Sequence, residues 1–146
     1  DWFKGLAWRF PSKVSTNIYF SNELAQRIYA ASDIFLMPSN YEPCGIGQLI
    51  AMRYGAAPVV RETGGLKDTV RQYDKYEKQG NGFVFSNYNA HEMMSAIRRC
   101  VAFYRAERGE FAELQKSDMR CDFSWNASMK KYVGLYENIT GEDDLP

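Results

Sequence analysis

The segment YEPCGIGQLIAMRYG, residues 41–55, places a glutamate, a proline, a cysteine and two glycines directly before an apolar run. Gly45 and Gly47 bracket the expected start of a helix. Glycine lets the backbone approach a ligand closely there, and the free N–H groups of a first helical turn attract anions. Glu42 is either a partner for the positive end of that helix or an acceptor for the hydroxyl groups of a sugar. The combination indicates a ligand that carries both phosphate and hydroxyl groups.

A second glycine loop, Thr63-Gly64-Gly65, follows the next expected strand. Taken alone, either loop is explained equally well by a tight turn between a strand and a helix. Two such loops at one edge of a sheet, with an acid beside them, favour a ligand with phosphate, and a pair of phosphates more than a single one. We therefore predict one phosphate site formed by both loops.

Cys44 is a candidate nucleophile because a thiol at a helix N-terminus can be activated. The sole histidine, His91, is placed at the start of a different helix, so no Cys–His pair is apparent and no covalent catalysis is expected. The three cysteines, Cys44, Cys100 and Cys121, are widely spaced and form no metal-binding motif. We therefore expect no metal, and the cysteine pattern favours a reducing, cytoplasmic compartment.

The elements that must position these residues alternate between strand and helix. Ser21 or Asn22, Asn89 and Ser124 are the expected helix caps. Strands are predicted at residues 14–20, 33–37, 57–61 and 82–85, and helices at 22–32, at 46–54, within 64–73, from Asn89, at 110–119 and from Trp125.

This alternation predicts an α/β fold with a Rossmann-like parallel sheet and helices on both faces. Loops that follow parallel strands leave at the carboxyl edge of the sheet, where open α/β sheets bind their ligands. Phe20, residues 42–47 and residues 61–65 are therefore expected to converge on one crevice.

Composition excludes several other classes of protein. The 146 residues fit one domain, and 45% hydrophobic with 15% aromatic residues argues against disorder. Lys+Arg and Asp+Glu both total 18, so the net charge gives no reason to expect a nucleic acid or an anionic membrane as partner. The apolar runs are far shorter than a membrane span.

Three blocks of the sequence resemble the bacterial glycogen synthases and plant starch synthases: PSNYEPCGIGQLIAMRYGAAPVVRETGGLKDTV, GNGFVFSNYNAHEMMSAIRRCVAFY and DFSWNASMKKYVGLYENI. The resemblance extends over residues 14–140. It implies the C-terminal, donor-binding domain of a two-domain (GT-B) retaining glycosyltransferase. Enzymes of this family transfer glucose from ADP-glucose, or in some members UDP-glucose, to the non-reducing 4-hydroxyl of an α-1,4-glucan. The resemblance implies no cofactor and no metal beyond that nucleotide sugar.

The same resemblance implies roles for individual residues. Glu42 matches the family's glutamate that holds the donor-glucose hydroxyls and is important for turnover. The backbone at Cys44 and Gly45 is expected to contact those hydroxyls. Phe20 stands where the family often has a tyrosine that stacks on the nucleotide base. The residues expected beside the phosphates are Ile46, Gly47, Thr63, Gly64 and Gly65.

The resemblance also implies a division of the chain. Residues 1–124 correspond to the nucleotide-sugar-binding domain without its first strand and loop, and residues 125–146 to a helix that crosses to the other domain, with a tail. The family's arginine and lysine that neutralise the diphosphate precede Asp1, and the glucan acceptor binds through the N-terminal domain. We therefore expect the chain to be a fragment that is inactive alone.

Two alternatives stay open at this point. The chain is also compatible with a non-catalytic nucleotide-binding or interaction module, or with a sibling GT-B glycosyltransferase that uses another acceptor. The choice between an adenine and a uracil donor is open as well. The C-terminal block favours a bacterial cytoplasm, with a plastid as the location if the protein is a plant starch synthase.

Overall fold

The computed structural model describes residues 1–141 of the 146-residue chain. Its described part contains one parallel sheet of three strands in the order β1-β2-β3: β1 (Ile34–Met37), β2 (Ala57–Arg61) and β3 (Phe83–Phe85). Ile34 lies opposite Ala57, and Val59 lies opposite Phe83. The strands predicted after residue 32 are thus confirmed, and their parallel pairing makes their loops leave at the same edge.

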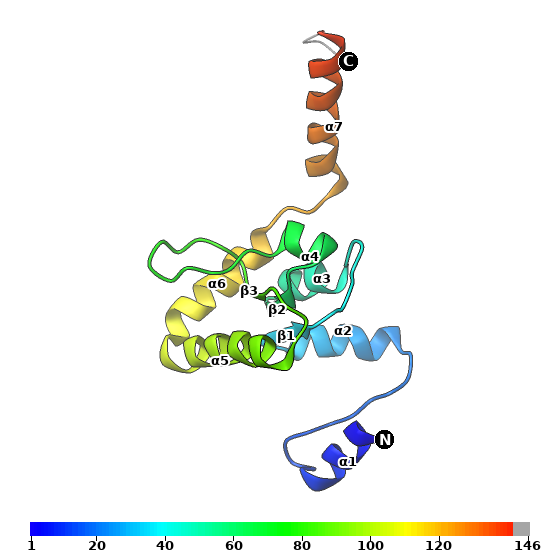
Figure 1. Cartoon of the computed structure of the whole chain (residues 1–146), viewed down its shortest axis with the longest axis vertical. Coiled ribbons are helices and arrows are strands. Elements are labelled where there is room, and N and C mark those ends of the chain that lie inside the picture. Colours follow the sequence, from blue (N-terminus) through cyan, green and yellow to red (C-terminus); the bar gives the residue numbers. More distant parts are fainter. Residues whose placement is uncertain (142–146) are drawn as a thin grey trace.

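Helices cover both faces of the sheet (Figure 1). Successive side chains of a strand point to opposite faces, so Val59 and Val60 of the central strand enter different cores. Val59 packs with residues of α5 (Ala90–Ala106) and α6 (Arg108–Arg120), and Val60 packs with residues of α3 (Gly47–Arg53) and α4 (Gly64–Thr69). This confirms the predicted α/β class with helices on both faces.

Three helices begin at the expected caps. The side-chain oxygens of Ser21, Asn89 and Ser124 each accept a hydrogen bond from the backbone N–H three residues later, at 3.2, 2.9 and 3.3 Å. The helices that follow are α2 (Asn22–Ala31), α5 and α7 (Trp125–Thr140). Each cap satisfies one of the N–H groups that a helix start leaves without an internal partner.

The strand predicted at residues 14–20 is wrong. This segment is an unpaired connection between α1 (Trp2–Arg9), a helix that the sequence analysis did not anticipate, and α2. Its one described tie to α1 is a hydrogen bond from Thr16 Oγ1 to the Phe3 carbonyl, at 2.9 Å. An alternating, β-branched pattern becomes a strand only where another strand supplies a hydrogen-bonding edge, and in the described sheet residues 14–20 do not pair with β1 or β3.

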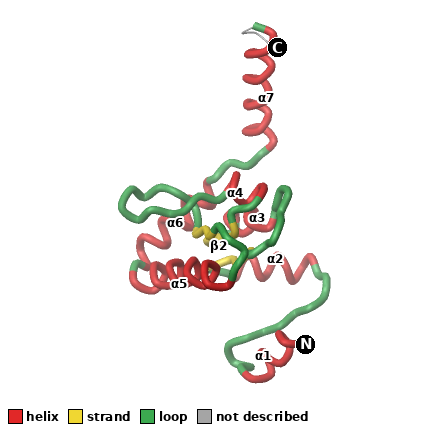
Figure 2. The backbone as a smooth tube through the Cα atoms, viewed as in Figure 1, coloured by secondary structure: helices red, strands yellow, loops and turns green. Residues whose placement is uncertain are grey.

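The first and last helices stand away from the sheet and its covering helices, as Figures 1 and 2 show. Neither α1 nor α7 has a buried residue. In α7 the apolar side chains stay exposed, with Trp125 at 86% and Ile139 at 72%. The predicted C-terminal segment also includes residues 142–146, which lie outside the described part of the chain. Within residues 1–141, no helix is both long and apolar enough to cross a membrane.

Candidate functional site

The two glycine loops are in direct backbone contact at the carboxyl edge of the sheet. The Gly65 N–H donates to the carbonyl oxygens of Glu42 and Pro43, both at 3.2 Å. A Cβ atom on Gly65 would collide with the Cys44 carbonyl oxygen, and one on Gly64 would collide with the Glu42 carbonyl oxygen. Only glycine therefore allows the loops after β1 and β2 to pack this closely.

The first loop turns sharply before α3. Gly45 has a φ of +73°, in the left-handed region that favours glycine, and Gly47 is the first residue of α3. The tight-turn explanation is thus correct for Gly45. A tight turn and a ligand site are compatible here, because the loop is accessible to solvent. Cys44 and Ile46 are exposed, and Glu42 is half-buried. The loop therefore presents its backbone and one carboxylate beside the exposed side chains of Tyr41 and Ile46.

A buried glutamine of α3, Gln48, connects the first loop to the helix that follows the second loop. The Gln48 Nε2 donates to the Gly45 carbonyl oxygen at 3.0 Å and to Thr69 Oγ1 at 3.1 Å. Thr69 Oγ1 in turn donates to the Gly65 carbonyl oxygen at 2.7 Å. Sequence reasoning missed both residues. The available signal was a single polar residue, Gln48, in an otherwise apolar helical run, and it is completely buried.

An arginine joins the loops that follow all three strands. Arg61, the last residue of β2, donates through Nη1 to the Asn40 carbonyl oxygen and through Nε to the Ser86 carbonyl oxygen, the latter at 3.1 Å. Its guanidinium carbon lies 5.6 Å from the centroid of the Tyr88 ring. The carboxyl edge is thus one connected structure, although its residues are far apart in the sequence.

The loop after β3 is held by a carboxylate at the start of α5. Glu92 Oε2 accepts hydrogen bonds from the backbone N–H groups of Asn87, at 2.8 Å, and Ser86, at 3.1 Å. Hydrogen bonds from the backbone and the side chain of Asn87 lower the pKa of Glu92. This carboxylate is therefore ionised at neutral pH and fixes the loop that also receives Arg61.

Phe20 is not brought to the glycine loops by any described contact. It lies in the connection that precedes α2 and is 89% exposed. Its expected position depended on a strand at residues 14–20, which does not form. His91, at the start of α5, also has no described contact with Cys44. Across residues 1–141, no group of three or more His, Cys, Asp or Glu side chains is placed to hold a metal ion.

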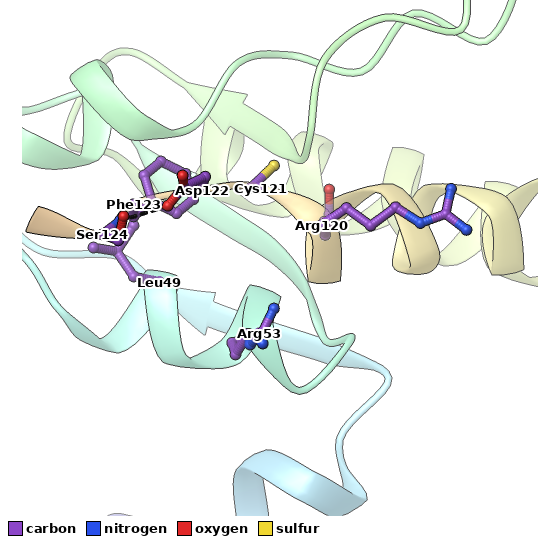
Figure 3. A pocket seen from close by; sticks show the side chains of 8 residues that line it. Leu49, Arg53, Arg120, Cys121, Asp122, Phe123 and Ser124 are labelled. Carbon is purple, nitrogen blue, oxygen red and sulfur yellow. Dashed lines mark hydrogen bonds between the residues drawn. The ribbon is translucent and has the colours of Figure 1, made fainter. Parts of the chain in front are cut away.

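A cavity of about 530 Å³ lies between α3, the end of α6 and the connection to α7, as Figure 3 shows. Leu49 and Arg53 of α3 and residues 120–124 line it, together with Asp118. Asp118 is 1% exposed, and neither carboxyl oxygen has a hydrogen-bond partner in the described part of the chain. Burial raises the pKa of Asp118 to about 8. None of the site residues predicted from the sequence lines this cavity.

Comparison with known proteins agrees with this arrangement of sheet and loops. The model of the family described as glycosyl transferases group 1 matches residues 6–111, and the chain belongs to that family. It is 52% identical over 139 residues to a glycogen synthase of Clostridium novyi, and 55% identical over 137 residues to a glycogen synthase of Clostridium acetobutylicum. These alignments cover 95% and 94% of the chain, and 29% of each relative. The chain thus spans less than a third of the length of the curated relatives it matches.

Solved structures show the same relationship. The catalytic domain of starch synthase IV from Arabidopsis thaliana, bound to ADP and acarbose, superposes with a TM-score of 0.80 at 36% identity, covering 96% of this chain and 29% of that one. A sucrose-phosphate synthase from Thermosynechococcus elongatus shares the fold, with a TM-score of 0.63 at 23% identity and coverage of 94% of this chain and 33% of that one. The resemblance to the glycogen and starch synthases is confirmed.

Proposed function

We propose that this chain is the donor-binding part of an enzyme that transfers glucose from ADP-glucose or UDP-glucose to the non-reducing 4-hydroxyl of an α-1,4-glucan, with retention of configuration. The observation that carries the proposal is the backbone contact between the two glycine loops beside Glu42. The similarity to the clostridial glycogen synthases supports the choice of donor and acceptor. No cofactor beyond the nucleotide sugar is proposed.

The proposed roles follow from what each group presents. The Glu42 carboxylate accepts hydrogen bonds from the glucose hydroxyls, and the backbone at Cys44 and Gly45 completes the sugar contacts. The backbone at Ile46 and Gly47 contacts the phosphates. The second loop, residues 63–65, lies beside the phosphates, but the Gly65 N–H already donates to two carbonyls of the first loop. Its main contribution is therefore to shape the first loop.

Transfer is proposed to need residues beyond this chain. The relatives are more than three times as long as the matched region, since it covers 29% of their length. The remaining part of the protein is the proposed source of the acceptor site and of cations that neutralise the leaving diphosphate, the step at which electrostatic stabilisation contributes most. The exposed apolar side chains of α7 support a role for this helix as the crossover to that part. Phe20 is proposed to stack on the base once that part is in place, and a bacterial cytoplasm is the proposed location.

A titration of the ¹⁵N-labelled chain with ADP-glucose, ADP and UDP tests the proposal. The amide signals of Gly45 and Gly47 are expected to shift, while those of Gly109 in α6 and Gly134 in α7 stay unchanged. Glu42→Gln should weaken binding of ADP-glucose by about tenfold, the loss of one charged hydrogen bond, and leave ADP unaffected.

The matched control is Glu77→Gln, which changes an exposed glutamate in the polar loop between α4 and β3. This variant should bind both ligands like the parent chain. Absence of any shift at Gly45 and Gly47 with millimolar ligand would overturn the proposal. So would an equal loss of ADP-glucose affinity in the two variants.

A further inference from the structure

The segment between Glu42 and Gly45 is held at one end by the second glycine loop and at the other by Gln48 of α3, which bonds Thr69 of α4. At one end, the Gly65 N–H donates to the Glu42 and Pro43 carbonyl oxygens. At the other, Gln48 Nε2 donates to the Gly45 carbonyl oxygen and to Thr69, and Thr69 donates to the Gly65 carbonyl oxygen. The hydrogen bonds form a closed circuit that passes from one loop to the other and back.

We propose that Gln48 is a positioning residue of the donor site, which completes this circuit and so fixes the backbone that carries Glu42 relative to the backbone around Gly45. This inference rests on the proposed function for its effect on ligand binding. Gln48 itself is completely buried, so its side chain is not accessible to a ligand. It acts through the carbonyl of Gly45 and the hydroxyl of Thr69.

The protons available in the circuit determine which residues can serve at position 48. The Thr69 hydroxyl has one proton, which goes to the Gly65 carbonyl, so its oxygen must accept from Gln48. The Gly45 carbonyl is also an acceptor. Position 48 must therefore supply two donors from one planar group, which an amide does and an ionised glutamate cannot.

A role limited to filling the core does not explain this glutamine. Its Oε1 is buried and has no hydrogen-bond partner within residues 1–141, and a buried unpaired acceptor is unfavourable. An apolar side chain of similar length, such as methionine, would avoid that penalty in the same space. The unpaired Oε1 of Gln48 is unfavourable for stability, whereas its Nε2 fixes the geometry of the first loop through two hydrogen bonds.

The chain contains a matched glutamine for comparison. Gln115 Nε2 donates to the Gly55 carbonyl oxygen at 2.6 Å, so it makes the same kind of bond to a glycine, at the opposite end of α3. Gln115 has no described contact with either glycine loop. Both Gln48→Met and Gln115→Met remove an amide bond to a glycine carbonyl, but only Gln48→Met also removes the bond to Thr69 that closes the loop circuit.

The first measurement is amide hydrogen exchange at Gly65, which needs no ligand. Gln48→Met and Thr69→Val should each lower the protection of the Gly65 amide from exchange by about tenfold. Thr69→Val removes the hydrogen bond to the Gly65 carbonyl, and Gln48→Met removes the hydrogen bond that holds the Thr69 hydroxyl in place. Thr69→Ser keeps the hydroxyl and should restore protection. Gln115→Met should leave it unchanged. Unchanged protection in Gln48→Met, or an equal loss in Gln115→Met, overturns the inference.

The second measurement is the affinity for ADP-glucose and for ADP in the same variants. Gln48→Met should weaken ADP-glucose binding by about tenfold and ADP binding less, since the sugar contacts depend on both ends of the 42–45 segment. If the parent chain binds neither ligand, the proposed function fails. Hydrogen exchange at Gly65 still tests whether Gln48 and Thr69 hold the two loops together. If the parent chain binds and Gln48→Met loses both ligands only in proportion to its unfolded fraction, the positioning role is refuted.

Discussion

The two ends of helix α3 carry the same types of residue but are held by different kinds of contact. Each is flanked by a glycine in the left-handed region, Gly45 with a φ of +73° and Gly55 with a φ of +81°. The carbonyl of each glycine accepts a hydrogen bond from a glutamine amide, Gln48 at 3.0 Å and Gln115 at 2.6 Å. The first glutamine belongs to α3 and connects the first glycine loop to Thr69 of α4, whereas the second belongs to α6 and connects that helix to the turn after α3.

The difference comes from a third glycine, Gly65 of the second loop, which packs against the N-terminal end. A Cβ on Gly45 would meet only the Gln48 side chain, but a Cβ on Gly65 would meet the backbone of Cys44, which cannot move without moving the loop. At the C-terminal end, a Cβ on Gly55 would lie 3.3 Å from the Met119 sulfur, at the flexible end of a side chain. The site end of α3 is thus specified by backbone contacts, and the other end by side-chain packing that can adjust.

The largest expected effect that tests this comparison is that of Gly65→Ala. The added methyl group must separate the two loops, so we expect a loss of about 3 kcal/mol in the free energy of unfolding, measured by urea denaturation. Gly55→Ala should cost about 1–2 kcal/mol, mainly because alanine is strained at positive φ. Equal losses in the two variants would show that the backbone contact at Gly65 is not the source of rigidity.

The buried acid near the C-terminal end of α3 predicts a pH effect. The pKa of Asp118 is raised from 3.8 to about 8 by burial, so the folded state favours the protonated form. The stabilising contribution is complete below about pH 4 and is lost as the pH rises through about 8. Relative to Asp118→Asn, the parent chain should therefore lose stability progressively as the pH rises between those limits.

Asp122, four residues further on, is the contrasting case. Hydrogen bonds from Ser124 lower its pKa, so its contribution is present above the ordinary pKa of an aspartate and is lost in acid. Relative to the parent chain, the thermal stability of Asp118→Asn should therefore change between about pH 4 and 8, whereas that of Asp122→Asn should change only below about pH 4, with the opposite sign. A parent stability that does not change relative to Asp118→Asn would contradict the burial argument.

The smallest expected effect belongs to Gln115→Met. Loss of the hydrogen bond to Gly55 should lower the free energy of unfolding by about 1 kcal/mol, since methionine replaces the glutamine volume. Denaturant midpoints of this variant and of Gln48→Met measure whether the two bonds contribute equally to stability. A much larger loss for Gln115→Met would mean that helix packing, rather than the loops, carries most of the stability around α3.

Several features of the fold were predictable because they depend on neighbours in sequence. The caps at Ser21, Asn89 and Ser124 each bond a backbone group three residues away, so the local sequence contains the whole interaction. The central strand β2, which is almost entirely buried, was predicted from the sequence with the bounds it has, residues 57–61. The segment at residues 14–20 has an equally good strand pattern, yet it remains unpaired because a strand needs an edge from elsewhere in the fold.

The candidate site divides in the same way. The sequence by itself determined which residue types stand at residues 42–47 and 63–65, and the order of parallel strands placed both loops at one edge. Only the tertiary structure decided that Gly65 holds Glu42, that Gln48 and Thr69 close the circuit, and that Phe20 lies apart. The physical reason is that glycine spacing and capping are local, whereas a hydrogen bond between residues 48 and 69 exists only after the sheet has brought two loops together.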